Sequence, residues 1–363
     1  MTTFSQDMNR IAISYLRFLI SDFRFFSCLL LLIALGGTNE VSGMPSCCAV
    51  PPEPASQPAS QPASQPSTRP ASRPSTRPAT QPATRPSSRP ATRPAVSRPA
   101  LPSSLSRALA RKDPSRLADK ALPRLGALSA GERNELYRRL ADWPVPRRVA
   151  ALAFLQVGTP YALGPLGEMM PPDTDPLIRF DKADCATMNL VAEALAHAAT
   201  SDDEDPCMIK ANYRHEVMSY ESRLHFTTDR LDVSPYDSDI TRRVGGSHVK
   251  SRLVTLNRRQ NGSRWIDIDW ERERRVDFLP IDFAERFPKM FQAGVLPEAM
   301  GVAFVQESRL KDGLDVVHES LLWQGRLLLH GSSRIGRVTT ISWKDFLRER
   351  GKTYDGVVLF EYL

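Results

Sequence analysis

One cysteine and two histidines in this chain have the types and spacing of a thiol-based catalytic site. Cys185 follows the polar stretch 180–184 and begins an apolar pattern with helical spacing. His318 and His330 come far downstream, twelve positions apart on adjoining strand-like stretches. Thiol catalysis needs a nucleophile, a base that accepts and later returns its proton, and a group that orients the base. We therefore predict that Cys185 is the nucleophile, His318 the general base, and His330 the residue that fixes the tautomer of His318.

A helix and a hairpin must bring these three side chains together. Asp184 can cap a helix that runs from Cys185 to about His197, because a carboxylate at this position accepts hydrogen bonds from free backbone N–H groups. The helix dipole favours negative charge in the first turn, so we expect a lowered pKa for the Cys185 thiol. His318 and His330 can share one face of the hairpin, and we expect the cysteine-bearing helix to pack on that face.

The rest of the pattern predicts helices first and an antiparallel sheet afterwards. Residues 104–146 form a helical lead-in, in which Ser129-Ala130-Gly131-Glu132 is a capping box. A short helix follows over 147–156. Strands are expected at 252–258, 265–270, 301–306, 315–323, 326–331, 338–342 and 357–360, with a last helix at 343–350. Asn261-Gly262 signals a hairpin between the first two strands, and Gln324-Gly325 turns between two later ones. We therefore predict one α+β domain over 104–363, with the nucleophile helix packed on a central antiparallel sheet.

The first 43 residues have the composition of an export signal. Arginines precede the apolar run Phe25–Leu35, which is too short for a comfortable transmembrane helix, and Val41-Ser42-Gly43 is a cleavage site. We therefore predict an exported protein in the periplasm or cell envelope. A lipoprotein is the alternative, because Met44-Pro45-Ser46-Cys47 loosely resembles a lipobox and a lipid on Cys47 would tether the chain to a membrane. We favour simple cleavage, since proline is unusual there and Cys47 lies well past the apolar run.

Residues 44–103 are predicted to be a disordered spacer. A tetrapeptide repeat over 55–94 places proline at nearly every fourth position, which favours extended polyproline II and cannot build a core. Residues 1–100 contain ten arginines and four acidic residues, so they carry +6 of the formal net charge of +7. The remainder is close to neutral, and no nucleic-acid-binding domain is indicated.

The remaining cysteines and histidines suggest neither a disulfide framework nor a metal centre. No Cys-x-x-Cys, His-x-x-x-His or His-Glu-x-x-His spacing occurs, so we predict no metal and no cofactor. Oxidising compartments favour paired cysteines, so a disulfide between Cys185 and Cys207 remains the alternative to a reactive Cys185.

Several short motifs carry a resemblance to a known superfamily. The chain resembles the NlpC-type cysteine peptidases, papain-like enzymes that cut bacterial cell-wall peptides, in Gly158-Thr159-Pro160-Tyr161, Asp184-Cys185, Asp315-Val316-Val317-His318 and Leu329-His330-Gly331-Ser332-Ser333. It is more narrowly similar to the N-acetylmuramoyl-L-alanine amidase-like branch in Asn212-Tyr213-Arg214, Tyr220, Arg223-Leu224-His225-Phe226, Asp229 and Gly313-Leu314-Asp315. The resemblance covers roughly residues 147–363.

The resemblance implies a papain-like, NlpC-type fold and a cell-wall hydrolase. The expected reaction is cleavage of the amide between N-acetylmuramic acid and L-alanine in muropeptides, through an acyl-enzyme and without a metal. The resemblance also implies that Tyr161 lies beside the nucleophile and that Asp184 helps to shape the first subsite. Candidate substrate-binding residues are Tyr161, Asp184, Tyr213, Arg214, Arg223 and His225. The expected partners are peptidoglycan fragments, with the protein acting as a monomer.

Two other functions remain open, and so do structural roles for His225 and Arg223. An endopeptidase that cuts between D-glutamate and diaminopimelate would use the same triad, whereas a degenerate, non-catalytic module would only bind peptidoglycan. His225 could instead be a structural histidine, and Arg223 a surface ion pair.

The sequence departs from the usual pattern of this branch in three places. Glu319-Ser320 stands where Val-Gly is usual, and Arg230 stands where an aromatic residue usually follows the aspartate. The stretch Met188-Asn189-Leu190 lacks an expected acidic residue. The three triad positions are intact, so we expect hydrolysis, and the departures bear on the choice of substrate.

Overall fold

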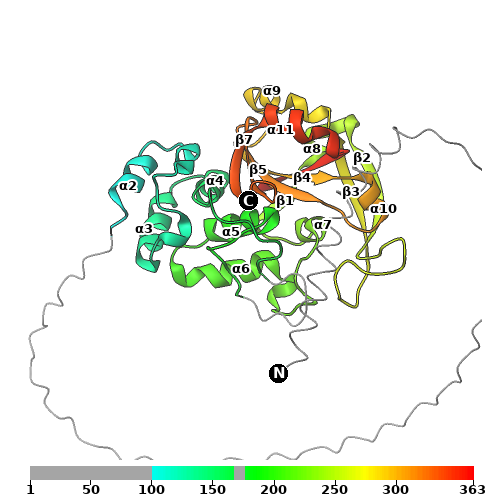
Figure 1. Ribbon diagram of the computed structural model, residues 1–363, viewed down its shortest axis with the longest axis horizontal. Coiled ribbons are helices and arrows are strands. Elements are labelled where there is room, and N and C mark those ends of the chain that lie inside the picture. The colour runs from blue at the N-terminus through cyan, green and yellow to red at the C-terminus, as the bar shows by residue number, and fades with distance from the viewer. Residues whose placement is uncertain (1–99, 167–175) are drawn as a thin grey trace, which may run out of the picture. The chain divides into compact units, whose positions relative to one another are not determined.

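The computed structural model describes residues 100–166 and 176–363 (Figure 1). The chain divides into two units, Met1–Ser88 and Arg89–Leu363, and the described residues belong to the second. The predicted export signal at 1–43, the lipobox cysteine Cys47 and most of the predicted spacer at 44–103 lie outside the described residues. Leu101 is already buried, and helix α2 starts at Ser103, so packed structure begins slightly before residue 104.

Helices dominate the first half of the described chain. They are α2 (Ser103–Leu109), α3 (Ala130–Leu140), α4 (Val145–Phe154), α5 (Cys185–Ala196) and α6 (Glu204–Asn212). The predicted capping box of α3 is confirmed, since Ser129 N donates to Glu132 Oε2 at 2.8 Å and Glu132 N donates to Ser129 Oγ at 3.3 Å. The short helices α7 (Thr227–Leu231), α8 (Thr241–Gly245), α9 (Phe287–Gln292), α10 (Glu307–Lys311) and α11 (Trp343–Arg350) are interspersed with the strands that follow.

A single eight-stranded sheet forms the centre of the described part. Its strands are β1 (Asp237–Asp239), β2 (Lys250–Leu256), β3 (Arg272–Pro280), β4 (Ala299–Val305), β5 (His318–Trp323), β6 (Leu327–Ser332), β7 (Arg337–Ser342) and β8 (Gly356–Tyr362). They are ordered β2-β3-β8-β4-β5-β6-β7, with β1 also paired to β8, and each of these pairings is antiparallel. The predicted α+β class is therefore confirmed. Within residues 100–166 and 176–363, no helix is both long and apolar enough to cross a membrane.

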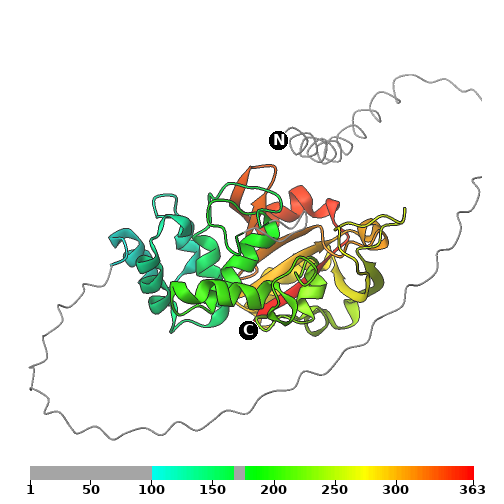
Figure 2. The same ribbon diagram turned by 90° about the horizontal axis from the view of Figure 1, so that it is seen from below.

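The sheet separates two hydrophobic cores. Because side chains alternate along a strand, Ala299 and Ala303 of β4 face one core, whereas Met300, Val302 and Phe304 face the other. The first core contains the buried faces of α4, α5 and α6, and the second contains those of α9 and α11. Figure 1 shows these two helical groups on opposite sides of the strands, and Figure 2 shows α5 and α6 in front of the sheet.

The predicted hairpin of 252–258 with 265–270 is wrong. Strand β2 pairs instead with β3, and residues 257–271 form a long loop between them. Asn257, at a φ of 69°, organises this loop with its side chain, whose Oδ1 accepts from Trp265 N at 3.1 Å and from Ile266 N at 2.8 Å. A side-chain amide thus takes the place of the expected strand ladder.

Candidate active site

The nucleophile candidate sits at the start of a firmly capped helix. Asp184 Oδ1 accepts from Thr187 N at 2.8 Å, and Asp184 N donates to Thr187 Oγ1 at 2.9 Å. This capping box starts α5 at Cys185, as predicted, and leaves the cysteine partly buried in the first turn. Asp184 Oδ2 also accepts from Gly164 N at 3.0 Å. The buried Asp184 carboxylate is therefore engaged on both oxygens, and it fixes the loop beside Cys185.

The two histidine candidates meet across the hairpin of β5 and β6. Gln324 and Gly325 have φ values of 50° and 64°, which match the turn that joins strands so closely. His318 Nε2 lies 3.0 Å from His330 Nδ1, and the two rings are nearly perpendicular at 88°. The predicted proximity of the histidines is thus confirmed. This hydrogen bond uses Nε2 of His318, so Nδ1 is its other ring nitrogen.

The cysteine and the two histidines are carried by elements that pack in different cores. The rings of His318 and His330 contact Phe346 of the second core, at centroid distances of 6.4 and 5.6 Å, whereas α5 packs in the first core. The expectation that this helix packs on the histidine face is therefore wrong. Gly331, beside His330, permits the close approach of the start of α5, because a Cβ there would lie 2.6 Å from the Asp184 carbonyl and 2.9 Å from Cys185 N.

A cavity of about 480 Å³ brings the three candidates together. Cys185, His318 and His330 line it, as does Tyr161, in agreement with the expected place of Tyr161 beside the nucleophile. Residues from the C-terminal part of the chain, which the sequence motifs did not indicate, complete the wall: Phe346, Glu349, Arg350 and Tyr354. For Phe346, Glu349 and Arg350 the only sequence signal is the helical pattern of α11, in which an aromatic residue serves equally well in a core, and Tyr354 lies beyond that helix.

The site favours the neutral forms of the Cys185 thiol and of both histidines. Burial, together with His330 and Arg350, lowers the pKa of His318 to about 3. Burial and two nearby arginines lower the pKa of His330 to about 4. Burial and the neighbouring Asp184 carboxylate raise the pKa of the Cys185 thiol, and backbone hydrogen bonds from Glu319 and Ala186 offset this only in part. The expected lowering of the Cys185 pKa is therefore wrong, because the loss of hydration outweighs the helix dipole.

The two most conspicuous departures from the family pattern contact each other. Arg230 Nη2 lies 3.1 Å from Glu319 Oε2, and both side chains are buried beneath the site. Arg230 Nη1 also lies 3.1 Å from Glu193 of α5 and 2.9 Å from Asp237 of β1. One guanidinium therefore joins helix α5, strand β1 and the residue that follows His318.

The other predicted substrate-binding residues lie outside the described lining of this cavity. Arg223 is buried, donates through Nη2 to Tyr213 Oη at 2.9 Å, and also hydrogen-bonds to the Leu166 carbonyl. It is therefore an internal support and not a surface ion pair. His225 Nε2 lies 2.8 Å from the Tyr220 carbonyl, which fits the structural alternative for this histidine. Arg214 belongs to a separate group of arginines, described below.

The described residues contain no disulfide and no cluster suited to a metal. Cys185 and Cys207 are both free thiols, so the alternative of a disulfide between them is wrong. Across 100–166 and 176–363, no three His, Cys, Asp or Glu side chains gather closely enough to hold a metal ion.

One family model and several solved structures are similar to this chain. A family model described as AmiA-like, N-acetylmuramoyl-L-alanine amidase-like, matches residues 151–352, more than half of the chain. A crystal structure of a Legionella pneumophila protein in the family DUF1460 is 19% identical, with 64% of this chain and 94% of that protein covered and a TM-score of 0.52. An N-acetylmuramoyl-L-alanine amidase from Bacteroides uniformis is 17% identical, with coverages of 60% and 98% and a TM-score of 0.44. No curated protein matches the chain. The Legionella structure shows a shared fold.

Proposed function

Because this chain belongs to the AmiA-like family of N-acetylmuramoyl-L-alanine amidase-like proteins, we propose that it is a cysteine amidase of the NlpC-type, papain-like class. Its substrate would be a muropeptide, and the bond cleaved would be the amide between N-acetylmuramic acid and L-alanine. The family membership itself points to a hydrolase acting on peptidoglycan. The observation that carries the thiol mechanism is the cavity shared by Cys185 and the hydrogen-bonded pair His318 and His330.

Proton transfer within the site would create the nucleophile. When the Nε2–H group of His318 donates a hydrogen bond to His330 Nδ1, the lone pair on His318 Nδ1 is left to accept the Cys185 proton. The two neutral histidines suit this role, since an imidazole must be neutral to act as a base. Through this hydrogen bond His330 then holds His318 in the tautomer that leaves Nδ1 free to accept a proton.

The thiolate would attack the carbonyl carbon of the muramic-acid lactyl group. The resulting oxyanion would be stabilised by backbone N–H groups in the first turn of α5. When the C–N bond breaks, His318 returns its proton to the amino group of L-alanine, and the lactyl group remains on Cys185 as a thioester. Water, deprotonated by His318, would then hydrolyse this thioester and release the sugar.

Product analysis tests the scissile bond. We expect digestion of a defined muropeptide to release a muramic-acid sugar with a free lactyl carboxylate and an intact stem peptide with a free amino terminus. Mass spectrometry of the products measures this directly. Fragments cut between D-glutamate and diaminopimelate would identify an endopeptidase instead, and an undigested but tightly bound muropeptide would identify a binding module. Loss of activity on adding a chelator would contradict the thiol mechanism.

The low pKa values of the histidines predict an unusual acid limit for activity. Because the pKa of His318 is about 3 and that of His330 about 4, both rings are neutral above about pH 5. We therefore expect kcat/KM to be sustained at pH 5 and to fall only as the pH approaches 4. The measurement is kcat/KM between pH 3 and 8, with circular dichroism at each pH as a control for folding. An acid limb centred near pH 6.5, the ordinary histidine value, would contradict this assignment.

We further propose that the protein acts outside the cytoplasm. The signal-like composition of residues 1–43 and the proline-rich repeat after it support export into the envelope, with lipidation of Cys47 as the alternative to simple cleavage.

A further inference from the structure

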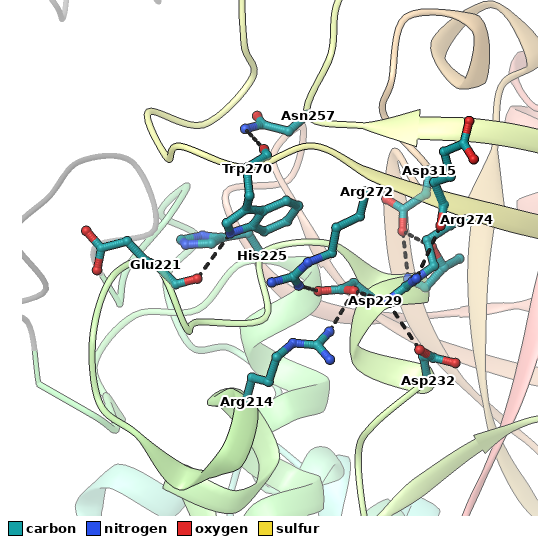
Figure 3. Close-up of polar contacts among 12 residues, drawn as sticks. Arg214, Glu221, His225, Asp229, Asp232, Asn257, Trp270, Arg272, Arg274 and Asp315 are labelled. Atoms are coloured by element: carbon teal, nitrogen blue, oxygen red, sulfur yellow. Dashed lines mark hydrogen bonds and ion pairs between the residues drawn. The ribbon is translucent and has the colours of Figure 1, made fainter.

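Three arginines converge on one buried carboxylate in a second polar centre (Figure 3). The carboxylate is that of Asp229 in α7, which is fully buried. Asp229 Oδ1 accepts from Arg214 Nη2 at 2.7 Å and from Arg274 Nη2 at 2.8 Å, and Oδ2 accepts from Arg272 Nη1 at 2.5 Å. The arginines come from two segments of the chain. Arg272 and Arg274 belong to β3, and Arg214 follows α6. We call these three residues the arginine cluster.

The arginine cluster has more positive charge than its acidic partners can neutralise. Asp229 supplies one negative charge, and the mostly exposed Asp232 supplies a second at 3.2 Å from Arg274. Three guanidinium groups against two carboxylates leave one positive charge in excess. The Nε atoms of Arg214 and Arg274 are buried without a hydrogen-bond partner among the described residues. A buried donor without an acceptor destabilises the folded protein, so an additional acceptor would stabilise the cluster.

The chemistry of Arg272 agrees with this shortage of negative charge. Burial lowers the pKa of Arg272, the Asp229 carboxylate raises it, and the neighbouring Arg214 and Arg274 lower it again. The guanidinium remains protonated near neutral pH, because its ordinary pKa is far higher. It therefore keeps its charge in surroundings that oppose that charge.

The arginine cluster is both accessible and held in place. The side chains of Arg214, Arg272 and Arg274 are 19%, 26% and 25% exposed, so a solute can reach them. The Arg272 guanidinium lies 4.0 Å from the centroid of the Trp270 ring, and Trp270 Nε1 donates to the Glu221 carbonyl at 3.1 Å. A guanidinium stacked in this way loses little further freedom on binding a ligand.

Helix α7 links the arginine cluster to the candidate active site. Thr227, two residues before Asp229, donates through Oγ1 to Glu319 Oε1 at 2.5 Å, and Glu319 directly follows His318. Thr228 N donates to Asp315 Oδ2 at 2.6 Å, just before β5. One short helix therefore contacts both the arginine cluster and the strand that carries His318.

We propose that the arginine cluster is a subsite for a free carboxylate of the substrate peptide. Guanidinium groups bind carboxylates through charge-assisted hydrogen bonds, often in pairs, which suits an acidic stem peptide. This inference rests on the proposed function, since it assigns the peptide side of that same substrate. Its consequence is that the enzyme discriminates against peptides whose carboxylates are amidated.

Paired substrates and matched arginine variants test the proposal. The substrates are two muropeptides of identical sequence, one with free stem-peptide carboxylates and one with these groups amidated. We expect Arg272→Gln and Arg274→Gln each to raise KM for the free-acid substrate roughly 10- to 100-fold, with kcat nearly unchanged. The same variants should leave KM for the amidated substrate almost unaltered. Arg272→Lys should recover only part of the lost affinity, because lysine keeps the positive charge but cannot donate the paired hydrogen bonds of a guanidinium.

The control is Arg275→Gln, which removes a mostly exposed arginine that follows Arg274 and is paired with Asp277. It should leave KM unchanged for both substrates. A purely structural cluster would instead change KM equally for free and amidated substrates, and this result would overturn the proposal.

Calorimetry with the inert Cys185→Ala variant separates this inference from the proposed function. If wild-type protein hydrolyses neither substrate, the proposed function fails. The calorimetric affinities for the free-acid and the amidated peptide then test the subsite independently. Preference for the free acid that Arg272→Gln removes supports the subsite, and equal affinity for both peptides overturns it.

Discussion

Replacing Cys185 by alanine is expected to lower the rate of muropeptide hydrolysis by about 10⁴-fold or more, because removal of a catalytic nucleophile leaves only binding and oxyanion stabilisation. The fold should be retained. The capping box that starts α5 uses Asp184 and Thr187, and the thiol takes no part in it. Mass spectrometry of the released sugar and peptide measures the loss, and thermal unfolding checks the fold.

A matched control for this variant is Cys207→Ala. Cys207 is the other free thiol among the described residues, and it is buried in α6. Its replacement should leave the rate of hydrolysis nearly unchanged. Full activity in Cys185→Ala would reject the thiol mechanism, and equal loss in both variants would indicate a general effect on packing.

Replacing Arg230 by leucine is expected to reduce the free energy of unfolding by about 3–5 kcal/mol, because three buried carboxylates would lose their common cation. Burial alone would lower the pKa of Arg230, yet the carboxylates of Glu319, Asp237 and Glu193 raise it, so the guanidinium is firmly charged. Urea-induced unfolding of the wild type and the variant measures the difference. Arg243→Leu is the control, because its pair with Glu361 is mostly exposed and should contribute about 0–1 kcal/mol.

The loss of stability in Arg230→Leu should grow as the pH rises. Burial raises the pKa of Glu193 and of Asp237 in the folded protein. The folded state therefore keeps protons that the unfolded chain releases above about pH 4.5, and stability falls with rising pH. Without Arg230 these pKa values rise further, so we expect a larger defect at pH 8 than at pH 5. A defect that does not change with pH would show that packing, and not charge, explains it.

The local parts of the site could be predicted from the sequence because short-range interactions determine them. Asp184 and Thr187 stand three positions apart and cap α5, and Gln324-Gly325 closes the hairpin that aligns the histidines. These contacts depend on neighbouring residues alone.

The long-range parts could not be predicted in this way. Strand β3 begins with the polar residues 272–275, of which Arg272 and Arg274 contact Asp229. The strand-like apolar pattern of 265–270 belongs instead to a loop. The raised pKa of Cys185 and the pairing of Arg230 with Glu319 both depend on burial by distant segments. No local pattern encodes that burial.

The close approach of the start of α5 to Gly331 gives the proposed catalytic residues two separate supports. Cys185, the proposed nucleophile, is carried by a helix of the first core, and His318, the proposed base, contacts the second core; they share a cavity where β5 begins and β6 ends. A change of volume in either core would therefore move one reacting partner relative to the other, even at residues far from the cavity. The relative position of Cys185 and His318 therefore depends on how the two layers pack against the sheet. Substitutions in either core can change it without any substitution in the site itself.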